Sequence, residues 1–152
     1  MNKPKILNII LTIEILRLIS LIIYLFVIYI FFFTQFSNQE LDSFRLGFLN
    51  AIFDGSDLSS YNLGKVSAPY FISLIVFILT IFFIIKNNKI GIIILLCIDF
   101  LGFFSRFSIG IVIPIILIIL FLFNKKIKEY FNYIKVMKKE IKGNKNGTQH
   151  DI

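Results

Sequence analysis

The distribution of charged residues is the feature that most constrains how this chain can fold. Three long stretches contain no Asp, Glu, Lys or Arg, and a fourth contains a single charge, Asp99. These stretches are Leu18–Gln39, Val66–Ile85, Phe107–Asn124 and, with Asp99, Ile90–Ser105. A helix needs about 20 apolar residues to cross the hydrocarbon layer, and lipid offers backbone amides no partner. We therefore expect each stretch to form a transmembrane helix.

Composition places the chain in the same class. It is 57% hydrophobic and only 16% charged, whereas a soluble domain carries about 25% charged residues. A single cysteine, Cys97, excludes an internal disulfide framework. The sequence thus predicts an all-α membrane protein, a four-transmembrane-helix bundle with an external amphipathic helix and a cytoplasmic basic amphipathic tail. The expected transmembrane domain is 1–123, with spans at about 12–36, 67–85, 89–105 and 107–123, an external loop at 37–66 and a tail at 124–152.

Lysine and arginine positions predict the orientation. With the N-terminus in the cytoplasm, 13 of the 16 basic residues fall on the cytoplasmic side and three, Arg45, Lys65 and Arg106, fall outside. The positive-inside rule therefore favours a multi-pass protein of the cytoplasmic membrane with both termini in the cytoplasm. The net charge of +7 is read as an orientation signal, and no nucleic-acid-binding motif accompanies it.

The external loop contains a helix signal. Ser37 and Glu40 fit a capping box, apolar residues then recur at helical spacing, and Asp54-Gly55 supplies a stop. We expect an amphipathic helix over 38–53, followed by a turn-rich segment up to a second helix start at Ser67-Ala68-Pro69.

Two roles are open for this helix: a lid packed over the bundle, or a docking site for an external ligand. The candidate recognition residues are Phe44, Arg45, Phe48, Asp54 and Asp57.

The tail reads as a basic amphipathic helix. An apolar stripe from Ile127 to Ile141 alternates with lysines, which favours an in-plane anchor on anionic lipid over a partner-binding helix. The candidate lipid-binding residues are Lys125, Lys128, Lys135, Lys138, Lys139 and Lys142.

Polar groups within the spans are the only chemical lead. Asp99 lies deep in its span, where a carboxylate is costly and is expected to face the bundle, as a structural contact or as a proton-coupling group. Glu14 and Arg17 are spaced for an i, i+3 pair on the first helix, and Arg106 flanks the third span. Pro114 is expected to kink the last span and to free the carbonyl of Gly110.

Parts that an enzyme would need are missing. His150, in the tail, is the only histidine, and no Gly-rich phosphate loop occurs. We expect no catalysis, no metal and no cofactor.

The remaining function is binding or association. Heavy use of Ile, Phe, Lys and Asn with two Ala suggests a bacterial source with an AT-rich genome. In size and architecture the chain resembles small bacteriocin-immunity and peptide-export accessory proteins. That resemblance implies that residues 38–68 recognise a membrane protein or a peptide. The alternative is a small proton-coupled transporter or channel subunit that uses Asp99.

Overall fold

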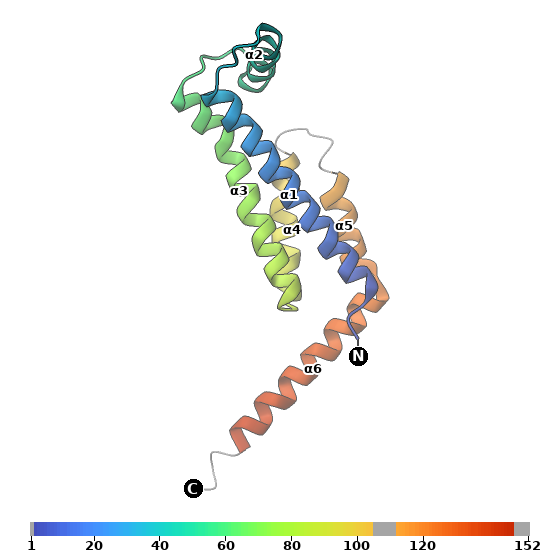
Figure 1. Ribbon diagram of the computed structural model, residues 1–152. Coiled ribbons are helices and arrows are strands. Elements are labelled where there is room, and N and C mark those ends of the chain that lie inside the picture. Colours follow the sequence, from blue (N-terminus) through green and yellow to red (C-terminus); the bar gives the residue numbers. More distant parts are fainter. Residues whose placement is uncertain (1, 105–111, 148–152) are drawn as a thin grey trace. The chain divides into compact units, whose positions relative to one another are not determined.

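The computed structural model describes residues 2–104 and 112–147, which form six helices and no strand. The helices are α1 (Lys5–Phe33), α2 (Gln39–Phe53), α3 (Ser60–Ile85), α4 (Lys89–Phe104), α5 (Val112–Phe123) and α6 (Lys125–Gly147) (Figure 1). The all-helical class predicted from the sequence is confirmed for this part of the chain.

Two helices, α1 and α3, are long and apolar enough to cross a membrane. They have 29 and 26 residues, or about 44 and 39 Å at about 1.5 Å per residue. Few of their side chains are buried within the protein, unlike those of a helix in a soluble core. The shorter α4 and α5 have 16 and 12 described residues, so the four-span bundle stays a prediction.

The chain divides into two compact units. Unit 1 contains residues 1–14 and 79–152, and unit 2 contains residues 15–78. The helices α1 and α3 each contribute one part to either unit. The predicted division into 1–123 and 124–152 stays a prediction.

In unit 1, α4 and α5 pack against each other, and α6 continues from α5 after a break at Asn124 (Figure 1). The amide of Ile127 donates to Oδ1 of Asn124 at 3.2 Å, so Asn124 caps α6 and separates it from α5. The buried core draws on all five helices of the unit: Leu7, Ile10, Ile84, Ile92, Leu96, Leu117, Phe121, Ile127, Tyr130 and Phe131.

The turn between α3 and α4 is tight. Asn87 adopts a left-handed conformation with φ of 53°, and Asn88 caps α4 by accepting from the amide of Gly91 at 3.1 Å. A Cβ atom on Gly91 would lie 2.6 Å from the ring of Phe83. The absence of a side chain at Gly91 therefore lets α3 and α4 approach closely beside this turn.

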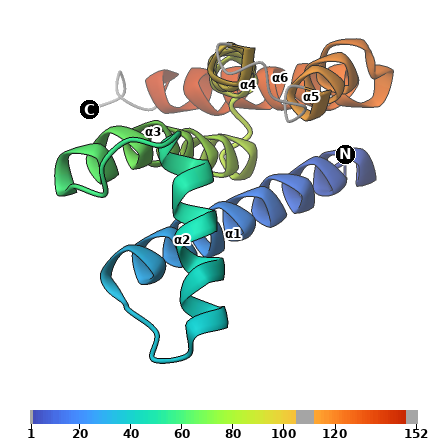
Figure 2. The ribbon, with the colours of Figure 1, turned by 90° about the horizontal axis from the view of Figure 1, so that it is seen from above.

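In unit 2, α2 lies crosswise to α1 and α3, next to the end of α1 and the start of α3 (Figures 1 and 2). The helix expected over 38–53 is confirmed, but its cap is one residue later than the capping box suggested. Asn38 Oδ1 accepts from the amides of Glu40 and Leu41 at 2.9 and 3.3 Å. The sequence contained two adjacent cap residues, and backbone geometry selects Asn38, whose ψ of 122° is extended.

The start of the following helix differs from the expectation. Instead of beginning at Ser67-Ala68-Pro69, α3 begins at Ser60, and Pro69 lies inside it. Ser59 caps this earlier start, because its Oγ accepts from the amide of Asn62 at 3.3 Å. Leu63 is buried in the core of unit 2, and this burial favours helix over the turn that the local composition suggested.

Candidate functional site

The first candidate site is built around Arg45 on α2. Arg45 is only 7% exposed. Its Nε donates to Oδ1 of Asp42 at 2.7 Å, and its Nη1 donates to the carbonyl oxygen of Phe31 at 3.0 Å. Phe31 belongs to the last turn of α1, where backbone carbonyls lack helical partners and the helix dipole favours a cation. Arg45 thus fastens α2 to the end of α1.

Asp42 completes this connection. Its Oδ1 also accepts from the amide of Phe36 at 3.3 Å, in the link between the two helices. The hydrogen bond from Arg45, together with the one from the Phe36 amide, holds the pKa of the Asp42 carboxyl below its ordinary value. The carboxylate therefore stays ionised under neutral and mildly acidic conditions.

Aromatic rings surround the same junction. Phe31 makes edge-to-face contacts with Phe36, Phe44 and Phe48, with ring centroids 5.2 to 6.1 Å apart. Phe53 stacks on Phe32 at 5.9 Å. These contacts and the guanidinium give α2 a defined position on unit 2.

The predicted recognition residues separate into two groups. Phe44 is 65% exposed, and Asp54 and Asp57 are also exposed. Phe48 is half-buried and Arg45 is buried. Arg45 was expected among the external contacts, but its guanidinium is committed to Asp42 and the Phe31 carbonyl, because a buried cation needs internal partners. Asp54 takes the left-handed position that ends α2.

The second candidate site is a set of buried polar side chains in unit 1. Glu14 is 1% exposed and Asp99 is 6% exposed, and Thr80 is equally buried. Each lies about one helical turn from a core residue: Glu14 after Ile10, Asp99 after Leu96, and Thr80 before Ile84. The chain directions of α3 and α4 are opposite (Figure 1). A step backward along α3, from Ile84 to Thr80, therefore leads the same way as a step forward along α4, from Leu96 to Asp99.

None of these three side chains is without a partner. Two carboxyl groups and a hydroxyl, from three helices, are thus buried in unit 1. Glu14 and Asp99 were candidates from the sequence, and the burial of Thr80 on α3 is a tertiary result.

The remaining intramembrane candidates are placed differently. The guanidinium carbon of Arg17 lies 4.4 Å from the centre of the Phe77 ring, a cation–π contact between α1 and α3. Pro114 is buried in α5. Arg106 and Gly110 lie outside the described residues, so the predicted kink and freed carbonyl stay predictions.

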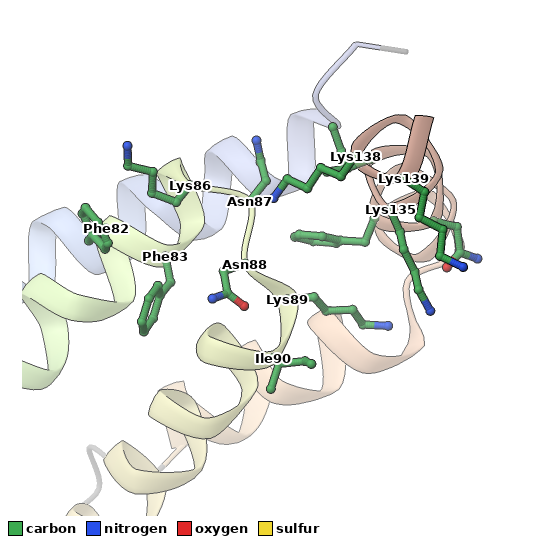
Figure 3. A pocket seen from close by; sticks show the side chains of 13 residues that line it. Phe82, Phe83, Lys86, Asn87, Asn88, Lys89, Ile90, Lys135, Lys138 and Lys139 are labelled. Carbon is green, nitrogen blue, oxygen red and sulfur yellow. The ribbon is translucent and has the colours of Figure 1, made fainter. Parts of the chain in front are cut away.

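The third candidate site is a cavity of about 910 Å³ in unit 1, between the α3–α4 turn and α6 (Figure 3). We call it the basic groove, because five lysines line it: Lys86, Lys89, Lys135, Lys138 and Lys139. Sequence analysis assigned Lys135, Lys138 and Lys139 to lipid but counted Lys86 and Lys89 only as orientation signals. Lys125 and Lys128 lie outside the groove lining, and the side chain of Lys142 lies outside the described part of the chain.

Among the residues that the structure describes, no group of three or more His, Cys, Asp or Glu side chains is arranged to hold a metal ion. Cys97 is exposed and is not disulfide-bonded.

No known protein family, curated protein or solved structure matches this chain significantly.

Proposed function

We propose that the chain is a non-enzymatic, multi-pass protein of a bacterial cytoplasmic membrane that acts by binding a partner at the outer surface. In this proposal α1 and α3 are two of four spans, and α4 and α5 are the other two. Support comes from the length and exposed apolar side chains of α1 and α3, and from the basic residues concentrated on the side of both termini. The crosswise α2 would then lie along the membrane surface (Figure 2).

The observation that carries the binding role is the contrast between neighbouring residues of α2. Arg45 is buried and fixes the helix, while Phe44 beside it is 65% exposed and Leu41 is 49% exposed. A fixed helix offers these apolar side chains to a partner without a large ordering cost on binding. The expected partner is a membrane protein or a membrane-active peptide with an apolar face, as in immunity or peptide-export accessory roles.

Survival of a bacterial host tests this proposal. Cells expressing the wild type are expected to survive a panel of membrane-active peptides better than cells with an empty vector. Phe44→Ser should remove the protection. Phe123→Ser, which changes another exposed phenylalanine, on α5, should preserve it.

Absence of protection by the wild type, or equal losses in the two variants at equal membrane abundance, would contradict the proposed role of α2.

The orientation is tested separately by cysteine labelling. Because Cys97 is exposed, Cys97→Ser is introduced first, and Ser59→Cys is then labelled with a membrane-impermeant maleimide. We expect labelling from the outside of intact cells. Labelling only after the cells are opened would overturn the proposed orientation.

A second candidate function is proton-coupled transport, which the burial of Glu14, Thr80 and Asp99 in unit 1 favours. Under this alternative the buried carboxyl groups of Glu14 and Asp99 would carry the proton, because ionisable groups buried in membrane helices commonly serve ion and proton pathways. Under this alternative Asp99→Asn abolishes resistance to cationic dyes while Phe44→Ser does not. Under the binding proposal the two variants behave in the opposite way in the peptide assay.

A further inference from the structure

The basic groove concentrates positive charge without internal compensation. Within the part of the chain that the structure describes, none of its five lysines forms an ion pair with a carboxylate. The Nζ atom of Lys86 lies 5.7 Å from the centre of the Phe82 ring, a cation–π contact. Like charges gathered around one cavity repel one another, so an anion held in the groove would stabilise it.

The groove also contains neutral hydrogen-bonding groups. Asn87, Asn88 and Asn132 line it beside the lysines. In Figure 3 the side chain of Lys138 extends from α6 toward Asn87, and that of Lys89 extends from α4 toward α6. Ammonium and amide groups from both sides of the groove are therefore available to oxygen atoms of one ligand.

The third component of the lining is apolar. Phe83, Ile90, Phe131 and Ile134 contribute to the same cavity. A site for a free inorganic anion has no use for four large apolar side chains, whereas an amphiphile uses both kinds of surface. The groove also lies at the C-terminal end of α3, where the uncharged stretch Val66–Ile85 is followed by Lys86.

Two contacts hold the groove in shape. The hydroxyl of Tyr130 on α6 donates to Oδ1 of Asn87 in the α3–α4 turn at 3.1 Å. Tyr130 and Phe131 are buried in the core of unit 1. The first two turns of α6 are thereby fixed against the α3–α4 turn, and the lysines of the next turns of α6 line the same cavity as Lys86 of that turn and Lys89 of α4.

We propose that the basic groove binds the headgroup of an anionic phospholipid. The lysines and asparagines contact the phosphate and glycerol oxygens, and the upper acyl chains lie against Phe83 and Ile134. A volume of about 910 Å³ is at the upper end of the range of about 300–1,000 Å³ that is usual for ligand sites. This proposal rests on the membrane placement of α3 and is independent of the partner-binding role of α2.

Lipid retention by the purified full-length protein tests the proposal. The protein in detergent is incubated with equal amounts of phosphatidylglycerol and phosphatidylcholine, and bound lipid is counted by native mass spectrometry. The wild type should retain phosphatidylglycerol preferentially. The variant Lys86→Gln/Lys89→Gln/Lys138→Gln should lose at least about ten-fold of that preference, given about 1 kcal/mol for each lysine near anionic lipid.

The matched control is Lys125→Gln/Lys126→Gln/Lys128→Gln. It removes the same charge from α6, at residues outside the groove lining. It should retain the preference. The single variant Lys138→Gln changes an exposed residue and should reduce the preference partially. It tests the proposal even if the triple variant misfolds.

Three results would overturn the proposal. Equal losses in the two triple variants would show diffuse attraction by the whole helix. Displacement of the lipid by soluble glycerol phosphate or inorganic phosphate would identify a free phosphate as the ligand. Equal retention of both lipids by the wild type would exclude an anion site. The lipid measurements do not depend on the survival assay. If that assay contradicted the binding role of α2, the lipid results would still decide the proposal for the basic groove.

Discussion

The amphipathic helices α2 and α6 are attached to the molecule in different ways. In α2 a buried arginine and a ring of aromatic contacts fix the whole helix against the end of α1. In α6 only the first turns contribute to a core, through Ile127, Tyr130 and Phe131, and the later apolar residues Met137 and Ile141 are exposed.

The difference indicates two kinds of partner. The exposed side of α2 contains Leu41 and Phe44, which favours an apolar partner at a rigid surface. The exposed side of α6 is rich in lysine, which favours an anionic partner such as the headgroup layer. Substitutions in the two units that contain these helices test this contrast.

The largest effect is expected for Arg45→Met. Methionine keeps the apolar stem but leaves the Phe31 carbonyl and Asp42 without their hydrogen-bond donor, at a cost of about 3 kcal/mol for two bonds to a charged group. Hydrogen exchange followed by mass spectrometry should show faster exchange of residues 39–53 and unchanged exchange of α6. If exchange in α2 stayed as slow as in the wild type, Arg45 would not be the contact that fixes it.

A smaller loss of stability is expected for Gly91→Ala, on α4 in unit 1, the unit that also contains α6. The added methyl group would meet the Phe83 ring at 2.6 Å, and such overpacking costs about 2 kcal/mol. Thermal unfolding in detergent should show the decrease. Gly47→Ala is the control, because a Cβ there meets nothing within 4 Å, and equal decreases would contradict close packing at Gly91.

The next largest effect on stability is expected at the N-terminal cap of α2. Asn38→Ala removes the side chain that accepts from two amides, which typically costs about 1 kcal/mol, whereas Ser37→Ala should change little. Exchange rates of the first turn of α2 distinguish the two variants. A larger effect of Ser37→Ala would show that Ser37 caps α2, as the capping-box pattern predicted.

Loss of a single hydroxyl at the base of α6 should cost less than about 1 kcal/mol. Tyr130→Phe removes the hydrogen bond to Asn87, and the expected result is increased motion of a spin label on α6 with little change in α2. Tyr133→Phe, which alters an exposed tyrosine, should leave the label unaffected. If both variants behaved alike, the Tyr130 hydrogen bond would not contribute to the attachment.

The smallest effect is a pH dependence confined to α2. Because the pKa of Asp42 is lower in the folded protein, its contribution is complete above the ordinary value of 3.8. It is lost as the pH falls through the lowered value. A spin label at Asn50→Cys, in a Cys97→Ser background, should become more mobile in that acidic range. Asp42→Asn should abolish the pH dependence, and its persistence would assign the effect to another group.

Much of the secondary structure followed from local sequence. The charge-free windows Leu18–Gln39 and Val66–Ile85 predicted the two helices that are long enough to cross a membrane, and helical spacing predicted α2 almost to the residue. Start positions were less accurate, because Ser37 and Asn38 are both good caps and because burial of Leu63 extends α3 back past Pro69.

The candidate sites depended more on tertiary structure. Glu14 and Asp99 stood out as charges in apolar surroundings, but Thr80 did not, because hydroxyl groups occur in many membrane helices. Lys86 and Lys89 were separated from the tail lysines by about 50 residues, and only the packing of α6 against the α3–α4 turn brings them together (Figure 3).

The sequence by itself determined the helical class and the two membrane-length helices, because both follow from how often charged and apolar residues recur along the chain. Tertiary structure alone decided that Arg45 is an internal connection and that lysines from the α3–α4 turn, α4 and α6 share one cavity. Periodicity shows which face of a helix is apolar or charged, but the function of a charge depends on what lies opposite it in space. That neighbour is set by the packing of segments distant in sequence.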